Sequence, residues 1–564
     1  MNITKYFIKK NVPNKLIFTS LFTILKYNLK NIKTMTNAIL LTDGYKLDHR
    51  RQYPVGTQFV YSNWTPRSNF YLPEAKKGAV VFGIQHFVKK YLIEYFNREF
   101  FSKPLDEVIN SFTRRVNAFL GPNEVGYQHV ADLHKLGYLP IKLKALPEGT
   151  ICPIRVPMLT IKNTLPEFFW ITNFLETIMS CELWLPMTSA TTAKLYMKEL
   201  ERHANKTGFP KEVDLGFLCH DFSMRGMAGL EAAITSGMGH LTSFIGSETI
   251  PAIDAIEEYY NVDAEKYNIA NTVPATEHSV MCAGGIEDEF GTFKRLLTEL
   301  YPKGFVSVVS DTWDYWKVVS EYAPRLEKEI RARDGRFVIR PDSGVPEDII
   351  CGIQDKDILT VNDECYYFKD IQLEGKDYIE ACKRNVLDNP DRYVKQKLTS
   401  YQIKGTYECL WDTFGGTVNE KGYKILDNCV GIIYGDSITL DRQKEIYRRL
   451  EEKGFAATNL VLGIGSYTYQ YRTRDSLGFA MKATWCQING EPKEIFKQPK
   501  TDSGMKNSLK GLIQVLKDEN GEYYAKDCVS LEEEQAGELK TVFKDGKIVK
   551  EYTFEEIRNN LKQY

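Results

Sequence analysis

Residues 430–437, VGIIYGDS, carry the pattern that decides the fold. An unbroken apolar run meets a glycine, an aspartate and a serine, and an amphipathic stretch through Ile446 and Leu450 follows. Short apolar runs without alternation are typical of strands that are buried on both faces, as in parallel sheets. A strand, a polar turn and a helix in series form one βα unit, so this stretch predicts an α/β fold.

Other stretches repeat this pattern. Residues 305–312 (FVSVVSDT), 337–344 (FVIRPDSG) and 460–466 (LVLGIGS) each pass from an apolar run into a polar turn. A further strand-like run at residues 215–218 (LGFL) precedes residues 220–226 (HDFSMRG). Ligands of such folds bind at the carboxyl ends of the strands, so we expect the chemistry of this protein at these turns.

The chain is long enough for a second packed unit. Its 564 residues exceed what one compact core usually supports. Strand-like runs at residues 79–82 and 141–143 lie on either side of a helical stretch at residues 85–96. The Asp-Gly pair inside residues 541–549 predicts a hairpin. An aromatic and charged block at residues 355–423 interrupts the βα rhythm and indicates an insertion.

Composition excludes several classes of protein. The chain is 43% hydrophobic and 26% charged, as in globular rather than disordered proteins. Its 73 basic and 74 acidic residues do not indicate non-specific nucleic-acid binding. Eleven cysteines without a C-x-x-C pair favour a reducing, cytoplasmic location and disfavour a structural zinc site. No segment after the first 42 residues is apolar enough to predict a membrane span.

The first 42 residues differ from the rest, with seven lysines and no acidic residue. The apolar run Leu16–Leu25 is too short to span a bilayer, and no small-x-small cleavage site follows it. We interpret this stretch as an N-terminal extension, with Met35 as the functional start, rather than as a targeting signal.

Several turns carry charged groups with two possible roles. Arg340 beside Asp342 suits a sugar phosphate, since Arg grips phosphate and Asp accepts from hydroxyls, but the same pair would also stabilise a turn. Asp311 and Asp436 follow predicted strands, where each could cap a helix or bind ribose hydroxyls or Mg²⁺.

The glycine-rich turn at residues 463–466 has the composition of a phosphate-binding loop, although a plain turn has it too. Basic residues that follow it could funnel an anion or simply form a solvated face: Arg472, Arg474, Lys482, Lys497, Lys500, Lys506 and Lys510. His278 is either a catalytic or a structural histidine. No Walker A loop, G-x-S-x-G elbow or H-E-x-x-H motif is present, which disfavours P-loop, serine-hydrolase and zinc-protease chemistry.

The body of the chain resembles the nicotinamide phosphoribosyltransferases, which are type II phosphoribosyltransferases. The matching blocks run from about Leu41 to the C-terminus: Asp43–Lys46, Tyr61–Arg67, His220–Gly226, Glu277–Ser279, Val308–Asp311, Ile339–Gly344, Tyr434–Asp436, Leu462–Asp475 and Thr541–Asn559. The resemblance implies an irregular (β/α) barrel, residues 179–474, packed on an α/β domain made of residues 43–178 and 475–564. It also implies a homodimer with shared active sites and no nucleic-acid or membrane partner.

The resemblance implies transfer of phosphoribose from phosphoribosyl pyrophosphate to nicotinamide, giving nicotinamide mononucleotide and pyrophosphate in NAD salvage. Phe222 would stack on the nicotinamide ring and Tyr45 of the partner subunit would cover its other face. Mg²⁺ would neutralise the diphosphate, and ATP would phosphorylate His278, which Asp311 orients. We expect the catalytic set to be His278, Asp311, Arg340 and Asp342.

Further contacts carry over by position. The ribose hydroxyls would meet Asp342, Gly435 and Asp436. The 5′-phosphate would meet Gly465, Ser466, Arg474 and Lys482, and the pyrophosphate Arg67, Arg225, Arg340 and the lysines from Lys497 onward.

The sequence departs from the family pattern at the carboxamide. Glu248 stands where the family has Asp, and Met224, Thr312 and Ser466 are further substitutions. The carboxylate of nicotinate would repel Glu248, whereas the amide of nicotinamide donates to it, so we predict nicotinamide as the substrate. The alternatives are a nicotinate phosphoribosyltransferase, a barrel glycoside hydrolase and a non-catalytic metabolite-binding protein.

Overall fold

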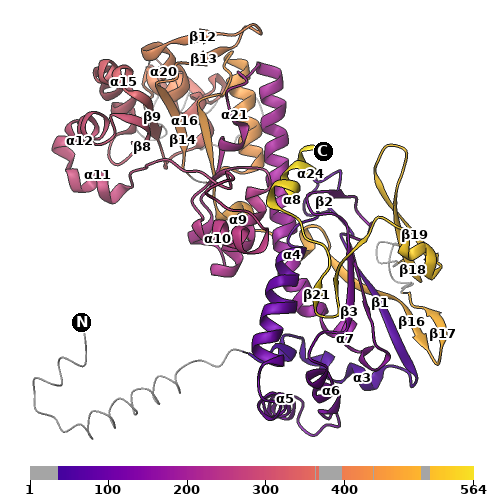
Figure 1. Cartoon of the computed structure of the whole chain (residues 1–564). Coiled ribbons are helices and arrows are strands. Elements are labelled where there is room, and N and C mark those ends of the chain that lie inside the picture. The colour runs from indigo at the N-terminus through magenta and orange to yellow at the C-terminus, as the bar shows by residue number, and fades with distance from the viewer. Residues whose placement is uncertain (1–35, 362–363, 368–396, 436, 497–508) are drawn as a thin grey trace, which may run out of the picture.

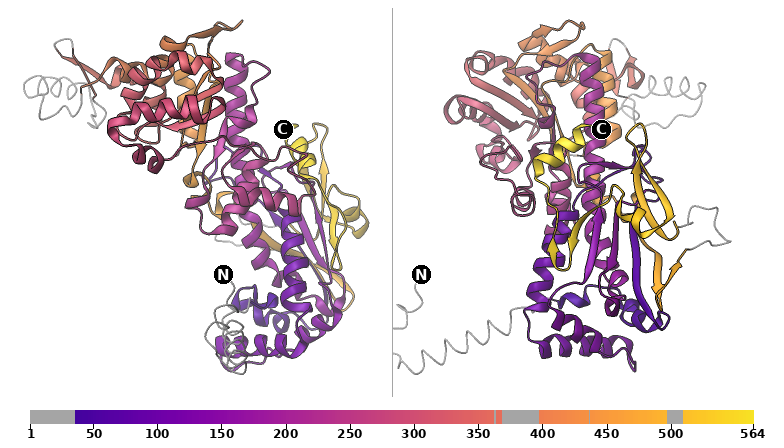
Figure 2. Two further views of the ribbon diagram at one scale, coloured as in Figure 1. Left: turned by 60° about the vertical axis from the view of Figure 1, so that its left-hand side comes forward. Right: turned by 45° about the vertical axis from the view of Figure 1, so that its right-hand side comes forward.

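The computed structural model describes residues 36–361, 364–367, 397–435, 437–496 and 509–564. Two large sheets organise it, a parallel one in the upper part of Figure 1 and an antiparallel one in the lower part. The long helix α8 (Glu176–Thr207) runs from one to the other, as the views of Figure 2 also show.

The parallel sheet contains the predicted βα strands. Its strands follow the order β7-β6-β15-β14-β9-β8, and each neighbouring pair is parallel. Their bounds are β6 (Cys219–Asp221), β7 (Gly246–Ser247), β8 (Lys303–Val309), β9 (Asp334–Arg340), β14 (Val430–Tyr434) and β15 (Leu460–Ile464). Four of the predicted strands are thus confirmed.

The strand predicted at residues 215–218 is wrong. Leu215–Phe217 form a 3-10 turn, and the strand begins at Cys219. The physical reason is Asp214, whose side chain accepts a hydrogen bond from the Gly216 backbone N–H at 2.8 Å and so caps the turn. His220 and Asp221 therefore lie inside the strand rather than after it.

A segment without regular structure joins the two edges of the parallel sheet. Asn271 bridges to Gly246 of β7, and Ala275 bridges to Ser307 of β8. The Thr276 N–H also donates to the Ser307 carbonyl at 2.9 Å. Residues 271–276 thereby turn the six-stranded sheet into an irregular barrel, in agreement with the predicted fold class.

The lower sheet is antiparallel, in the order β17-β16-β1-β5-β3-β20-β21. Its strands are β1 (Thr57–Thr65), β3 (Ile141–Ala145), β5 (Leu159–Asn163), β16 (Ala480–Ile488), β17 (Glu491–Glu494), β20 (Lys540–Lys544) and β21 (Lys547–Ile548). The predicted hairpin is confirmed, since β20 pairs with β21 around Asp545 and Gly546, which have φ angles of 48° and 78°.

Helices cover both sheets. The helix predicted at residues 85–96 is confirmed as α4 (Ile84–Phe87) continued by a π-helical stretch (Val88–Tyr95). Around the lower sheet lie α3 (His49–Gln52), α5 (Leu105–Leu120), α6 (Gln128–Leu136) and α7 (Ile171–Phe174). The barrel side includes α9 (Leu230–Leu241), α10 (Ile250–Tyr259), α12 (Glu289–Arg295), α15 (Glu327–Ala332), α16 (Pro346–Cys351), α20 (Thr406–Phe414) and α21 (Leu440–Glu452).

The apolar side chains form two main cores. The first draws on residues 38–187 and 477–543, and the second on residues 193–469. Helix α8 contributes Leu183 and Met187 to the first core and Tyr196 and Leu200 to the second. Ala38 and Ile39, which precede the boundary expected at residue 43, are buried in the first core.

The expected insertion at residues 355–423 falls partly outside the described residues. The described part begins with a 3-10 turn (Asp355–Asp357) and the hairpin of β10 (Ile358–Val361) and β11 (Glu364–Tyr367). It also includes α19 (Ser400–Lys404) and β12 (Gly416–Val418). Helix α20 of this block packs Tyr407, Leu410 and Phe414 into the second core. Its later part is therefore integral to the barrel.

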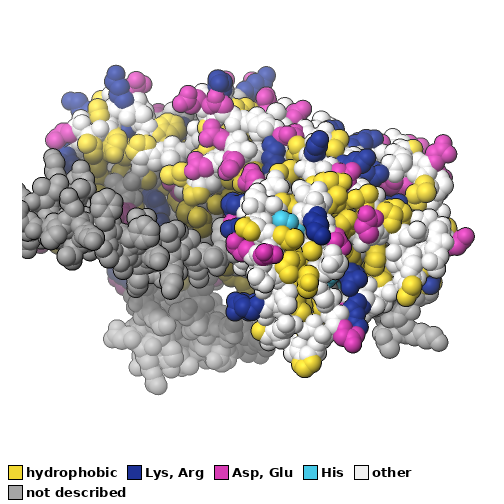
Figure 3. All heavy atoms as spheres, turned by 60° about the horizontal axis from the view of Figure 1, so that its bottom comes forward, with side chains coloured by type: hydrophobic (Ala, Val, Ile, Leu, Met, Phe, Trp, Pro, Cys, Tyr) yellow, Lys and Arg dark blue, Asp and Glu magenta, His cyan; other side chains and the backbone are white. Residues whose placement is uncertain are grey.

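The cysteines and the surface charge of the described residues agree with what the composition indicates. In the described part of the chain no helix is both long and apolar enough to cross a membrane. The ten cysteines in the same residues are free thiols. On the face turned toward the viewer in Figure 3, basic and acidic side chains are interspersed, so this face carries charge of both signs.

Candidate active site

The carboxyl ends of the parallel strands bring the predicted residues together. Phe222 follows β6, and Arg340 is the last residue of β9, 118 positions later in the chain. The guanidinium carbon of Arg340 lies 5.1 Å from the centroid of the Phe222 ring. Phe222 is only partly buried, so an aromatic face and a cation are presented side by side at this edge.

Asp342 forms an ion pair with Arg340. Arg340 Nε donates to Asp342 Oδ1 at 3.1 Å, so the local pairing weighed from sequence is present within the site. Gly435, directly after β14, leaves room for this pair: a Cβ atom there would lie 1.8 Å from Asp342 Oδ1. Only glycine permits this close approach. Asp436, predicted beside Gly435, lies outside the described residues.

His278 and Asp311 make the second polar pair. His278 begins α11 (His278–Gly284), and its Nε2 lies 3.2 Å from Asp311 Oδ1. The side chain of His278 is 49% exposed, whereas that of Asp311 is 4% exposed. Asp311 caps no helix, because the next one, α13 (Tyr315–Lys317), is capped by Asp314.

Asp311 is held by the loop that carries Asp342. Its Oδ2 accepts from the Asp342 backbone N–H at 3.0 Å and from Ser343 Oγ at 2.6 Å. One carboxylate thus links the imidazole to the Arg340–Asp342 turn. The role of Ser343 was not foreseen, since its partner lies 32 residues away and a serine in a turn carries no specific signal.

Glu248 lies on the turn between β7 and α10 and is exposed. Its backbone N–H donates to the Asp221 carbonyl at 2.9 Å, at the end of β6. Thr272 Oγ1, on the segment that closes the barrel, donates to the Glu248 carboxylate. Thr272 is a second residue that the sequence did not indicate, because only the closing segment brings it here.

The turns around Arg225 and Ser466 pack on each other. Arg225 is exposed in the turn Met224–Gly226, and Ser466 begins the short helix α22 (Ser466–Gln470) after Gly465. A Cβ atom at Gly226 would lie 2.1 Å from Ser466 Oγ, so these turns touch. Arg225 and the candidate phosphate loop therefore share one region.

Arg67 and Arg474 form a separate cationic pair. Arg67 Nε donates to the Gly478 carbonyl at 2.9 Å, and Arg474 begins the turn Arg474–Ser476. Burial and the nearby Arg474 charge lower the pKa of Arg67. Two neighbouring guanidinium groups have the charge and donors that suit an anion. Lys497, Lys500 and Lys506 lie outside the described residues, and Lys510 packs over the ring of Phe496.

Tyr45 and Lys482 lie elsewhere in the chain. They line one cavity of about 480 Å³ together with His49, Tyr53 and Asn173. Tyr45 lies in the 3-10 turn Gly44–Asp48 directly before α3, which lies at the foot of the molecule in Figure 1, whereas β9 and β14 lie in its upper part. A single chain therefore does not bring Tyr45 to Phe222. Tyr45 is 64% exposed.

The carboxylates of this edge are already engaged with neighbouring groups. Across the described residues, no group of three or more His, Cys, Asp and Glu side chains is arranged to hold a metal ion. Asp342, with its side chain 24% exposed, and the exposed Glu248 are the carboxylates described here that are open enough to meet a ligand.

Comparison with known proteins gives consistent matches. Residues 217–547 match the model of the nicotinate phosphoribosyltransferase (NAPRTase) family, and residues 37–143 that of the nicotinamide phosphoribosyltransferase N-terminal domain. The chain is 45% identical to the nicotinamide phosphoribosyltransferase of Acinetobacter baylyi, over 93% of this chain and 97% of that protein. It is 34% identical to that of Mycoplasma pneumoniae, over 86% and 98%.

A solved structure shares the fold. The nicotinate-nucleotide pyrophosphorylase of Pyrococcus furiosus aligns with a TM-score of 0.50 at 16% identity, covering 94% of this chain and 97% of that chain.

Proposed function

Since this chain belongs to the nicotinate phosphoribosyltransferase family, we propose that it is a nicotinamide phosphoribosyltransferase of NAD salvage. The reaction joins nicotinamide and phosphoribosyl pyrophosphate into nicotinamide mononucleotide and releases pyrophosphate. The observation that carries the proposal is the convergence of Phe222, Arg340 and Asp342 at one edge of the barrel. An aromatic face suits a flat heterocycle, and the charged pair beside it suits a sugar diphosphate.

Nicotinamide would lie on the Phe222 ring with its carboxamide toward Glu248. The amide N–H would donate to the Glu248 carboxylate, which Thr272 holds in place. Nicotinate would instead bring a second carboxylate to the same point. These contacts support nicotinamide over nicotinate as the pyridine substrate.

The chemistry requires little acid or base. The lone pair of the ring nitrogen attacks C1′ of the ribose, the C1′–oxygen bond breaks, and its electron pair leaves with pyrophosphate. Positive charge builds on the ribose and passes to the pyridinium ring. Because the nucleophile carries no proton, we assign most of the rate enhancement to positioning and to stabilisation of the leaving diphosphate.

Different charged residues would bind different parts of phosphoribosyl pyrophosphate. Asp342 and the backbone at Gly435 would hold the ribose hydroxyls, and Arg340 and Arg225 would meet the diphosphate. Mg²⁺ would enter bound to the diphosphate of the substrate, since it prefers oxygen ligands. Asp342 would be the nearby protein carboxylate available to it. The 5′-phosphate would be bound by Gly465, Ser466, Arg474 and Lys482, while Arg67 would meet the diphosphate together with Arg340 and Arg225.

His278 would accept a phosphoryl group from ATP. A ring nitrogen attacks the γ-phosphorus, the bond to the bridging oxygen breaks, and ADP leaves with the electron pair. With Nε2 facing Asp311 at 3.2 Å, Nδ1 is the nitrogen available for this step. The half-exposed ring supports this role, and Asp311 would act as a positioning residue for it.

We propose a homodimer in which each site uses both chains. Tyr45 and Lys482 lie at the other end of the molecule from Phe222, and the tyrosine ring is exposed. A second copy would supply these two side chains to the first copy's site.

The direct test is product formation. Purified protein is mixed with nicotinamide, phosphoribosyl pyrophosphate and Mg²⁺, with and without ATP, and the mononucleotide is measured. We expect product from nicotinamide, less from nicotinate, and stimulation by ATP that His278→Ala abolishes. No product from either pyridine would refute the proposal, and product that is indifferent to ATP would refute the assigned role of His278 alone.

A further inference from the structure

The carboxylate of Asp221 is buried beneath the candidate site and binds two donors. Asp221 is the last residue of β6, and its side chain is fully buried. Its Oδ1 accepts from the Ser223 backbone N–H at 2.9 Å, and its Oδ2 accepts from Thr249 Oγ1 at 2.8 Å. These donors belong to two different turns, 26 residues apart in sequence.

Each donor is the direct neighbour of a residue assigned to the pyridine. Ser223 follows Phe222, and Thr249 follows Glu248. The Asp221 backbone carbonyl also accepts from the Glu248 N–H at 2.9 Å, and the Phe222 N–H donates to the Ile464 carbonyl of β15 at 2.9 Å. The three hydrogen bonds that Asp221 accepts therefore fix the turn that carries the aromatic ring and the turn that carries the amide acceptor.

The charge of Asp221 is met by hydrogen bonds rather than by a cation. Among the described residues no Lys, Arg or His lies in an ion pair with it. Nearby His240 is engaged by the Tyr469 hydroxyl at Nδ1 and by the Gly246 carbonyl at Nε2, at 2.6 and 3.0 Å. Burial lowers the pKa of His240, which keeps the ring neutral. A buried carboxylate is costly, so a site that keeps one uses its two acceptors.

We propose that Asp221 is a positioning residue that sets the spacing between the Phe222 ring and the Glu248 carboxylate. The ring and the carboxylate must be separated by the width of a pyridine carboxamide, and the Asp221 side chain ties together the backbones that fix this separation. Asp221 touches no substrate and acts through Phe222 and Glu248. This inference rests on the proposed function, since it concerns how nicotinamide is held.

The test uses Thr249→Val, Thr249→Ser and Asp221→Ala. Valine is nearly isosteric with threonine but lacks the donor, serine keeps the donor, and alanine removes both acceptors of Asp221. We expect Thr249→Val to raise KM for nicotinamide about tenfold and Asp221→Ala to raise it at least as much, with KM for phosphoribosyl pyrophosphate changed less than twofold. Thr249→Ser should restore the wild-type KM. The double variant should be no worse than Asp221→Ala alone, because Asp221→Ala already removes the bond that Thr249→Val removes.

Thr207→Val is the matched control. Thr207 is also a fully buried threonine, and its hydroxyl donates to the His203 carbonyl within α8 at 2.9 Å. It should lower the melting temperature without changing KM for nicotinamide. The positioning role is refuted if Thr249→Val raises both KM values equally, if the control raises KM for nicotinamide as much, or if the two single effects add. An inactive wild-type protein would instead refute the proposed function.

Discussion

At the scale of single residues, we expect Glu248 to determine which pyridine is accepted. Its exposed carboxylate faces the position proposed for the carboxamide, and Thr272 fixes it there. Glu248→Gln removes the charge but keeps the length, so repulsion of nicotinate disappears. We expect the ratio of kcat/KM for nicotinamide over nicotinate to fall about tenfold, measured with both pyridines at saturating phosphoribosyl pyrophosphate.

The control for this change is Glu258→Gln. Glu258 is an exposed glutamate on α10, the helix that follows the Glu248 turn. It should leave the ratio unaltered. An unchanged ratio in Glu248→Gln would mean that this side chain does not meet the carboxamide.

A second prediction at this scale concerns the substitution of Gly435 by alanine. A Cβ atom there would lie 1.8 Å from Asp342 Oδ1 and 2.9 Å from Arg340 Nε, so Gly435→Ala must displace the ion pair. Because a shift of about 1 Å in catalytic groups costs roughly a hundredfold, kcat/KM should fall by about that factor. The melting temperature should move little, since the pair lies at the rim of the barrel. Activity within twofold of wild type would contradict the proposed placement of Asp342.

Judged from the residues alone, without the family resemblance, the sequence indicated a pair whose partners are local and missed contacts whose partners are distant. Arg340 and Asp342 are two positions apart, so their pairing could be weighed from the sequence. Thr272 and Ser343 bond to carboxylates 24 and 32 residues away. Those contacts depend on which strands are neighbours and in what register, and no single-residue pattern encodes that.

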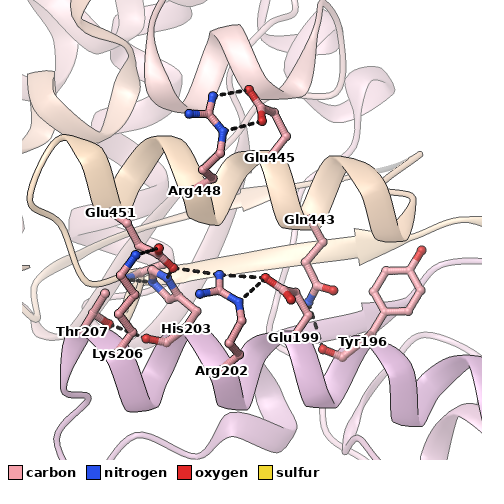
Figure 4. A network of polar contacts seen from close by, with 11 residues as sticks. Tyr196, Glu199, Arg202, His203, Lys206, Thr207, Gln443, Glu445, Arg448 and Glu451 are labelled. Carbon is pink, nitrogen blue, oxygen red and sulfur yellow. Dashed lines mark hydrogen bonds and ion pairs between the residues drawn. The ribbon is translucent and has the colours of Figure 1, made fainter. Parts of the chain in front are cut away.

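At the scale of elements, a cluster around the buried Glu451 carboxylate joins α8 to α21. Arg202, His203 and Lys206 of α8 all bond to the Glu451 carboxylate of α21, at 2.8, 2.8 and 2.5 Å (Figure 4). Burial alone would raise the pKa of Glu451, but these three partners lower it to about 2. His203 also accepts from the Ala457 N–H at Nε2, and burial lowers its pKa to about 4.

Both pKa shifts make the fold less stable as the pH falls. His203 binds a proton more readily when unfolded, so its contribution is complete above pH 6.5 and is lost between about 6.5 and about 4. The Glu451 contribution is complete above about 4.5 and is lost as the pH falls toward about 2. Wild-type melting temperature should therefore decline below pH 6.5 and more steeply below 4.5.

Glu451→Gln tests the cluster. It should destabilise the fold by about 2 kcal/mol at pH 7, because three donors lose a charged acceptor and two of them are partly exposed. Its melting temperature should then decline less than that of wild type below pH 4.5. Glu445→Gln is the control, since Glu445 pairs with Arg448 on the surface of the same helix (Figure 4) and should cost under about 0.5 kcal/mol. Equal losses in the two variants would contradict this account.

Elements were predictable where burial on both faces left an unbroken apolar run. The strands at β8, β9, β14 and β15 are of this kind. Residues 215–218 are apolar in the same way, but Asp214 caps a 3-10 turn there instead of a strand. Residues 271–276 close the barrel with only isolated bridges, and such a segment has no periodicity to detect.

At the scale of the whole molecule, the resemblance implied a site shared by two chains, and the described chain holds its parts at two ends. Tyr45 and Lys482 line a cavity on the lower sheet, whereas Phe222 and Arg340 meet on the barrel. No local pattern indicates this separation, because it depends on how α8 spaces the two cores.

Mixed dimers test the sharing of sites. Lys482→Ala and Arg340→Ala should each be nearly inactive alone, because every site in either homodimer lacks one group. If the two residues of one site come from different chains, a mixed dimer has one site missing both groups and one intact site. After unfolding and joint refolding of equal amounts, half of the dimers are mixed, so about a quarter of wild-type activity should return. Lys482→Ala refolded with Tyr45→Ala should recover no activity. In the proposed dimer one chain supplies both Tyr45 and Lys482 to a site, so every site in that mixture still lacks one of the two. No recovery in the first mixture would show that Arg340 and Lys482 of one site come from the same chain. Recovery in the second mixture would show that Tyr45 and Lys482 of one site come from different chains.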